Sequence, residues 1–412
     1  MKRAGVVLLV VATACGGTPP APLTPTLSGL AALQALEDSG KELPRPELHQ
    51  PGADTNDAAP YFRLGQSLVF VNEKLDTAEL ALYWASRLDP ALPEPFFVRS
   101  LIPLTALRND AFETWLRTHS LRATDKVALT PRQIRVVDSL QYLAWQRNPF
   151  MFSALEFRWV SSIRPSAIRG RKADPIDEGW WAFSNRRFAE AESLFAVGLK
   201  KHPDAIGVRI YRARALFYLG RYDAAVAELE MARDTVVRTV EARISPIVQS
   251  VEMFDFAIGI ARVQQDSFRA ARAAFERALT ENLGLSWAHT RLAGSELALH
   301  DTAAALAELE TATQLENRDP ALFLYKGVVL QTAGRLSEAL EPLQRAIELD
   351  PYYAAPYYWL ALAHRKAGDA PRAIERYRQY LTRAALADVN RAAARRELDS
   401  LTAAAGLPGR PH

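Results

Sequence analysis

The chain has 412 residues, of which 50 are lysine or arginine, 47 are aspartate or glutamate and one is cysteine. This near balance of charge argues against a surface specialised for nucleic acid, so no nucleic-acid partner is expected. A chain of this length is longer than those that usually fold around one compact core, but it suits an elongated protein. A single cysteine excludes an intramolecular disulfide.

Residues 1–14 have the pattern of an export signal. A positive start at Lys2 and Arg3 precedes an apolar run and the small residues Ala12 to Ala14, and the run is shorter than the roughly 18 residues that span a bilayer. The placement of Cys15 directly after them resembles the bacterial lipoprotein box, although the family prefers leucine where Ala12 stands.

This resemblance implies that Cys15 is acylated and becomes the first residue of the mature chain. It also implies a membrane attachment through the lipid anchor, in the bacterial cell envelope and most simply at the outer membrane facing the periplasm. The alternative is an ordinary secretory signal in which Cys15 has no role. Residues 15–57, rich in proline at the start, are predicted to be a flexible linker.

Two degenerate helical repeats are predicted over residues 58–125. The first contains Gly65, Leu82 and Asp89, and the second is weaker. Residues 126–171 break the period and are predicted to form an irregular, mostly helical insert. Within it, Thr130 followed by a proline predicts the start of a helix that ends near Gln146.

Residues 172–387 show a period of 34 residues, and six units are predicted there. In the four most regular units the eighth and twentieth positions carry glycine or alanine, and the twenty-fourth carries a large apolar residue. Small residues at these points allow two helices to approach to about 8–10 Å. The positions are Gly259, Ala293, Gly327 and Ala361; Ala271, Ala305, Ala339 and Ala373; and Phe275, Leu309, Leu343 and Tyr377.

This pattern resembles the tetratricopeptide repeat family. The resemblance implies an all-α fold, a solenoid of helical hairpins wound into a right-handed superhelix, because no unit buries its apolar faces alone. Residues 388–412 are predicted to form a capping helix, over Asp388 to Ala404, and a tail.

Members of this family bind partners on the concave face formed by the first helix of each unit, and they act as scaffolds, not enzymes. The corresponding positions of this chain are largely apolar and lack the lysine, asparagine and arginine clamp of some members, so they suit an amphipathic helix or apolar peptide. The alternative is a superhelix that buries them against itself or against the N-terminal segment. The predicted groove residues are Trp180, Phe183, Ile210, Arg214, Phe217, Phe256, Ile260, Trp287, Leu324, Val328, Tyr358 and Leu362.

No catalytic residue, metal site or cofactor is predicted, because the sequence has no zinc-helix spacing, nucleophile elbow or phosphate loop. The leading hypothesis is therefore a lipid-anchored periplasmic adaptor that holds a protein partner within an envelope assembly or secretion machine. The alternative is a ligand-binding lipoprotein of a transport system that takes up a lipid, glycan or other small molecule. An enzyme with its site in residues 126–171 is the least favoured hypothesis.

Overall fold

The computed structural model describes residues 39–48, 51–71, 74–118, 128–150, 165–167, 173–238 and 251–405, together with Leu30, Leu33, Ala35 and Glu37. Every secondary-structure element in these ranges is helical, which confirms the all-α fold class. The predicted signal, Cys15 and much of the predicted insert lie outside the described residues. None of the helices described is long and apolar enough to cross a membrane.

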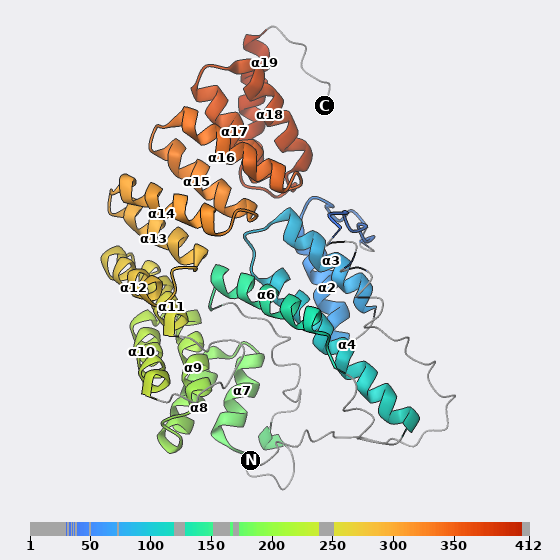
Figure 1. Cartoon of the computed structure of the whole chain (residues 1–412), viewed down its shortest axis with the longest axis vertical. Coiled ribbons are helices and arrows are strands. Elements are labelled where there is room, and N and C mark those ends of the chain that lie inside the picture. The colour runs from blue at the N-terminus through green and yellow to red at the C-terminus, as the bar shows by residue number, and fades with distance from the viewer. Residues whose placement is uncertain are drawn as a thin grey trace.

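The helices form two groups, which we call the arm and the array (Figure 1). The arm comprises α2 (Ala58–Val71), α3 (Leu75–Leu88), α4 (Glu94–Thr118) and α6 (Pro131–Arg147), with residues 39–57 and 148–150 beside them. A short 3-10 helix, η2 (Pro165–Ala167), precedes the array. The array comprises α7 (Pro175–Ser184), α8 (Phe188–Lys201), α9 (Ile206–Tyr218), α10 (Tyr222–Arg238), α11 (Val251–Val263), α12 (Phe268–Glu281), α13 (Ser286–Ala298), α14 (Thr302–Leu315), α15 (Pro320–Thr332), α16 (Leu336–Leu349), α17 (Ala355–Lys366), α18 (Ala370–Arg383) and α19 (Arg391–Ala404).

Successive helices of the array pair into hairpins from α7/α8 to α17/α18, and α19 packs on α18 as the cap. The predicted close approach is present inside each regular hairpin. A Cβ atom added to Gly259 would lie 2.3 Å from the ring of Phe275, and one added to Gly327 would lie 2.5 Å from Leu343. The alanines at the twentieth positions are fully buried. The register of the repeats is therefore confirmed.

The arm differs from the predicted pair of degenerate repeats. Its first hairpin, α2/α3, is present, but the second unit is a single helix of 25 residues, α4, whose partner is α6. This hairpin crosses the boundary predicted near residue 125. Helix α6 begins where expected, because the Thr130 side chain accepts a hydrogen bond from the Gln133 N–H and the Gln133 side chain returns one to Thr130.

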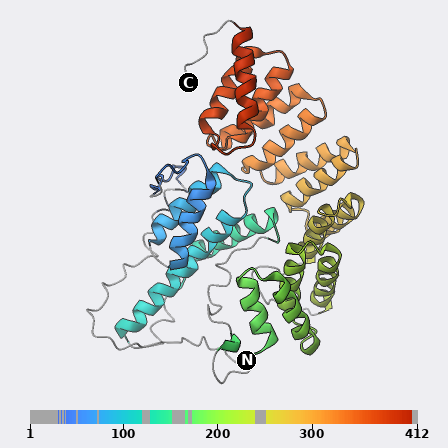
Figure 2. The same ribbon diagram turned by 180° about the vertical axis from the view of Figure 1, so that it is seen from behind.

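The arm lies along the inner side of the curved array, and the two views agree on this placement (Figures 1 and 2). The two groups share one hydrophobic core. Phe97 of α4 and Trp145 of α6 belong to the same cluster of buried residues as Phe256 of α11 and Trp287 of α13. Since these rings are removed from water only when both groups are in contact, the shared core stabilises their association.

Two smaller expectations need correction. Residues 39–48, predicted as linker, pack on the arm: Leu43 is buried, and its carbonyl accepts a hydrogen bond from the Trp84 indole at 3.1 Å. Helix α19 begins at Arg391 and not at Asp388 as predicted, so Val389 lies in the preceding turn and is 89% exposed.

Candidate binding cleft between the arm and the array

None of the predicted groove residues is exposed. Half of them are buried and half are partly buried, so the open apolar groove expected from the repeat pattern is absent. The buried members are Phe183, Ile210, Arg214, Phe256, Trp287 and Leu324, and the partly buried members are Trp180, Phe217, Ile260, Val328, Tyr358 and Leu362.

The end of α6 covers the centre of the predicted groove. Trp287 is only 1% exposed, and its backbone N–H donates a hydrogen bond to the Gln146 side-chain oxygen at 3.4 Å. Ser286 donates to the same oxygen at 3.2 Å. The guanidinium of Arg147 lies 4.9 Å from the Trp287 ring. The chain itself therefore occupies the face where a partner helix was expected.

The neighbouring groove positions are covered in the same way. Phe150, which follows α6, stacks on Phe217 with ring centroids 3.9 Å apart, and its carbonyl accepts a hydrogen bond from Tyr218. The Arg214 guanidinium lies 5.4 Å from the Trp145 ring of α6. These contacts explain why Phe217 and Arg214 are not presented to solvent.

The remaining predicted residues pack within the array. Trp180 makes an edge contact with Tyr211 at 4.5 Å, and Phe183 lies against the same ring at 5.3 Å. Tyr358 packs 5.4 Å from Tyr380. The alternative weighed from the sequence was burial of these positions against the superhelix itself or against the N-terminal segment. Packing within the array is present, but the cover over the centre of the face comes from α6 and Phe150, which were predicted to belong to the insert.

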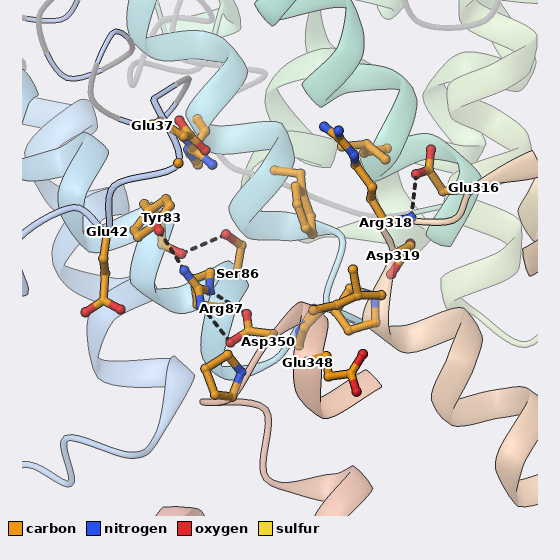
Figure 3. Close-up of a pocket in the computed structure, with 18 of the residues that line it drawn as sticks. Glu37, Glu42, Tyr83, Ser86, Arg87, Glu316, Arg318, Asp319, Glu348 and Asp350 are labelled. Carbon is orange, nitrogen blue, oxygen red and sulfur yellow. Dashed lines mark hydrogen bonds and ion pairs between the residues drawn. The ribbon is translucent and has the colours of Figure 1, made fainter. Parts of the chain in front are cut away.

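A cleft of about 750 Å³ remains between the arm and the array. Figure 3 shows that its walls come from both groups: Tyr83 and Arg87 project from the arm, and Arg318, Glu348 and Asp350 from the array. The walls are mostly charged. The full lining is Glu37, Gly40, Lys41, Glu42, Tyr83, Ser86, Arg87, Pro90, Phe96, Arg99, Leu143, Arg147, Glu316, Arg318, Asp319, Pro320, Arg345, Glu348, Leu349, Asp350 and Pro351.

The inner wall of the cleft is held by Arg147. Its Nη2 donates to the Asp319 carboxylate at 2.5 Å and its Nε to the Pro90 carbonyl at 2.8 Å. The same Asp319 oxygen accepts a hydrogen bond from the Trp287 indole, and the other caps α15 at Ala321. Burial lowers the pKa of Arg147, and the charge of Asp319 opposes this effect. Because both charged groups are buried, removing either one would leave the other as a buried charge without an ion-pair partner, which destabilises the fold.

The outer wall is held by the end of α3 against the turn after α16. Arg87 donates to both oxygens of Asp350, at 2.5 and 3.0 Å. Burial is the largest single influence on the pKa of Arg87 and lowers it, but the hydrogen bonds and charges of Asp350 and Tyr83 together outweigh burial and raise the pKa. Tyr352 packs edge-on against Trp84 at 4.8 Å and donates a hydrogen bond to Glu42.

Two of the cationic side chains that line the cleft have no bonding partner among the described residues. Lys41 and Arg318 are exposed, and within the described part of the chain neither side chain forms a hydrogen bond or ion pair. The six carboxylates of the walls, in contrast, all accept at least one hydrogen bond or ion pair. The cleft therefore offers donors for carboxylates or peptide carbonyls of a bound chain.

No metal centre is formed by the described residues, because they contain no group of three or more His, Cys, Asp or Glu side chains that could hold an ion. Two histidines of the described part of the chain, His289 and His364, are buried. His289 bonds Glu308 at 2.6 Å and the Leu283 carbonyl, and burial lowers the pKa of His364.

Comparison with known families supports the repeat assignment. A TPR repeat model matches residues 332–368, and a tetratricopeptide repeat model matches residues 182–240. The chain thus contains tetratricopeptide repeats, and its fold is a solenoid of helical hairpins of that type. No curated protein matches the sequence at significant similarity.

Several solved structures are similar over half of the chain or less. YrrB, a TPR protein with an unusual peptide-binding site, is 20% identical, with 46% of this chain and 91% of YrrB covered and a TM-score of 0.36. A C-terminal part of a TPR repeat-containing protein from Cytophaga hutchinsonii is 17% identical, with 50% of this chain and 77% of that protein covered and a TM-score of 0.42. MamA from Desulfovibrio magneticus RS-1 is 16% identical, with 43% of this chain and 93% of the MamA chain covered and a TM-score of 0.37.

Proposed function

We propose that this protein is a lipid-anchored scaffold that holds a segment of a protein partner in the cleft between its arm and its array. The site of action is the periplasmic side of the bacterial envelope, within an assembly or secretion machine. Acylation of Cys15 supplies the membrane attachment, and the protein acts by binding, not by catalysis. The observation that carries the proposal is a cleft whose walls come from two groups and offer unpaired donors.

The chemistry of the walls favours a polypeptide. Small-molecule sites carry only a small number of placed polar groups, whereas twelve of the residues that line this cleft are charged, and they come from both groups. A peptide presents carbonyl oxygens at every residue and often carboxylates, both of which Lys41 and Arg318 can bind. Since the apolar concave positions are covered by α6 and Phe150 or packed within the array, the cleft replaces them as the partner surface.

The alternative hypothesis is a ligand-binding lipoprotein of a transport system, and only the volume of the cleft supports it. The cleft lies within the roughly 300–1,000 Å³ of small-molecule sites. The aromatic residues Trp145 and Phe150, first considered for such a ligand, are instead buried in packing contacts, and the cavity beside Phe150 holds only about 20 Å³.

Photocrosslinking in the native envelope tests the proposal. A photoreactive residue replaces Arg318 or Glu348 of the cleft in two variants, and Glu341, exposed on α16 outside the cleft, in the control. We expect the same protein adduct from both cleft positions and none from the control. When the photoreactive residue replaces Glu348, the additional substitution Lys41→Glu should lower the yield of the crosslinked adduct. Adducts of equal yield from Glu341, or different proteins from each cleft position, would exclude the cleft as the site.

A further inference from the structure

The contact between the arm and the array has two parts of different character, one on each side of the cleft. The inner part is a core contact. The side chains of Arg147 and Asp319 are 2% and 4% exposed, and Trp145 packs in the cluster that contains Trp287. Separating these groups would leave buried charges without partners and expose large rings to water, so this part holds the two groups together.

The outer part is polar and its edge is open to solvent, although the Asp350 carboxylate at its centre is only 5% exposed. It consists of Asp350 and Tyr352 of the array held by Glu42, Arg45 and the end of α3, and of two exposed hydrogen bonds beside them. In these, the Asn56 amide donates to the Thr382 carbonyl and the Leu386 N–H donates to the Asp54 carboxylate. The Arg87 side chain is 23% exposed, Glu42 and Arg45 are exposed, and Tyr352 is partly buried. We call this set of contacts the clasp. The exposed contacts of the clasp are individually weak, and the Arg87–Asp350 pair, whose carboxylate is buried, is its strongest contact. Polar interfaces between groups permit relative motion of the groups they join.

Each side of the clasp keeps its shape without the other. On the arm, the Trp84 indole donates to the Leu43 carbonyl, and Arg87 donates to the Tyr83 hydroxyl, both within the arm. On the array, Asp350 accepts a hydrogen bond from the Tyr352 N–H in its own turn. Opening the clasp therefore requires no unfolding of either side.

We propose that the clasp opens and closes about the inner contact, which acts as the hinge, and that it regulates entry of a polypeptide into the cleft. The inference rests on the proposed function of that cleft. Arg87, Asp350 and Pro351 line the cleft as well as forming or adjoining the clasp. Its closed form therefore narrows the cleft from the outer side, and its opening widens the same space without disturbing the core around Trp287.

A distance measurement between the two groups tests the hinge without any partner. Spin labels are placed on the full-length chain at Arg63→Cys of α2 and Glu341→Cys of α16, both exposed, in a Cys15→Ser background. The distance distribution is measured by pulsed electron spin resonance with the clasp intact and with Arg87→Gln, Tyr352→Ala, Asn56→Ala and Asp54→Ala combined, so that every hydrogen bond of the clasp between the arm and the array is removed. The matched control is Arg335→Gln, which removes an exposed ion pair to Glu338 inside α16 alone.

We expect one main distance for the intact clasp and a several-fold larger population at longer distances in the clasp variant, with the control unchanged. Far-ultraviolet circular dichroism must show the same helical content in all samples. An unchanged distribution in a folded clasp variant would overturn the hinge. That result would leave the cleft crosslinks intact, whereas loss of the crosslinks with normal opening would count against the proposed function only.

Discussion

Removing Arg147 is the perturbation whose cost follows most directly from the structure. Arg147→Met keeps an apolar chain against Phe96 and Trp287 but leaves the Asp319 carboxylate buried without its guanidinium partner. Breaking a buried pair in this way typically costs about 3–5 kcal/mol. The Pro90 carbonyl also loses a donor. The Trp287 indole still donates to Asp319, which places the expected loss near the lower end of that range.

Urea denaturation of the full chain measures this loss. Tryptophan emission reports the arm and array contact, because Trp145 and Trp287 lie in the shared core. We expect a lower midpoint by this probe in Arg147→Met. Adding Asp319→Asn should restore part of the stability, because the amide keeps the cap oxygen for α15 and removes the unpaired charge.

The control for this experiment is Arg335→Met, which removes an exposed ion pair on α16 and should change the midpoint little. The reasoning would be refuted by equal shifts for Arg147→Met and Arg335→Met. It would also be refuted if Asp319→Asn in the Arg147→Met background lowered the stability further, since that would show the buried carboxylate to be stable without its partner.

Four further outcomes are expected. Ala339→Leu should overpack a fully buried close approach and cost about 1–3 kcal/mol, whereas Glu341→Gln should change thermal stability little. Leu324→Ser should lower the unfolding free energy by about 2–5 kcal/mol, because the side chain is buried and not presented to a partner. Burial raises the pKa of Asp89, so the ionised carboxylate destabilises the fold at pH values above that raised pKa. Asp89→Asn should therefore raise the unfolding free energy at neutral pH. This increase in stability should disappear as the pH falls below 3.8, the ordinary pKa of aspartate. Cys15→Ala should release the protein from membranes after a high-salt wash, and continued sedimentation would contradict the lipid anchor.

The fold of the array could be predicted because its determinants are local. Glycine or alanine at one position and a large apolar residue sixteen positions later lie face to face in one hairpin, as Gly259 with Phe275 and Gly327 with Leu343 do. The helix starts were equally readable, since Thr130 and Gln133 form a capping box within four residues.

The cleft could not be predicted, because it is made by residues far apart in the chain. Arg87 and Asp350 are separated by 263 positions, and Arg147 and Asp319 by 172. Asp319 and Asp350 occur beside prolines, where aspartate is expected simply as a helix end, and nothing local distinguishes them as ion-pair partners. The apolar concave pattern was interpreted as a groove for a partner, with burial by the chain itself as the alternative, and the sequence did not show that α6 covers the centre of this face.

The central claim, that the arm lies on the inner face of the array, is tested most directly by thiol labelling at Ser286. This residue is buried at the start of α13, and its hydroxyl donates to Gln146 of the arm. In a Cys15→Ser background, Ser286→Cys should react with a maleimide only very slowly in the native protein, whereas Ser337→Cys, exposed on α16, should react as a free thiol does. Equal labelling rates for the two cysteines would contradict the packing of the arm against the array.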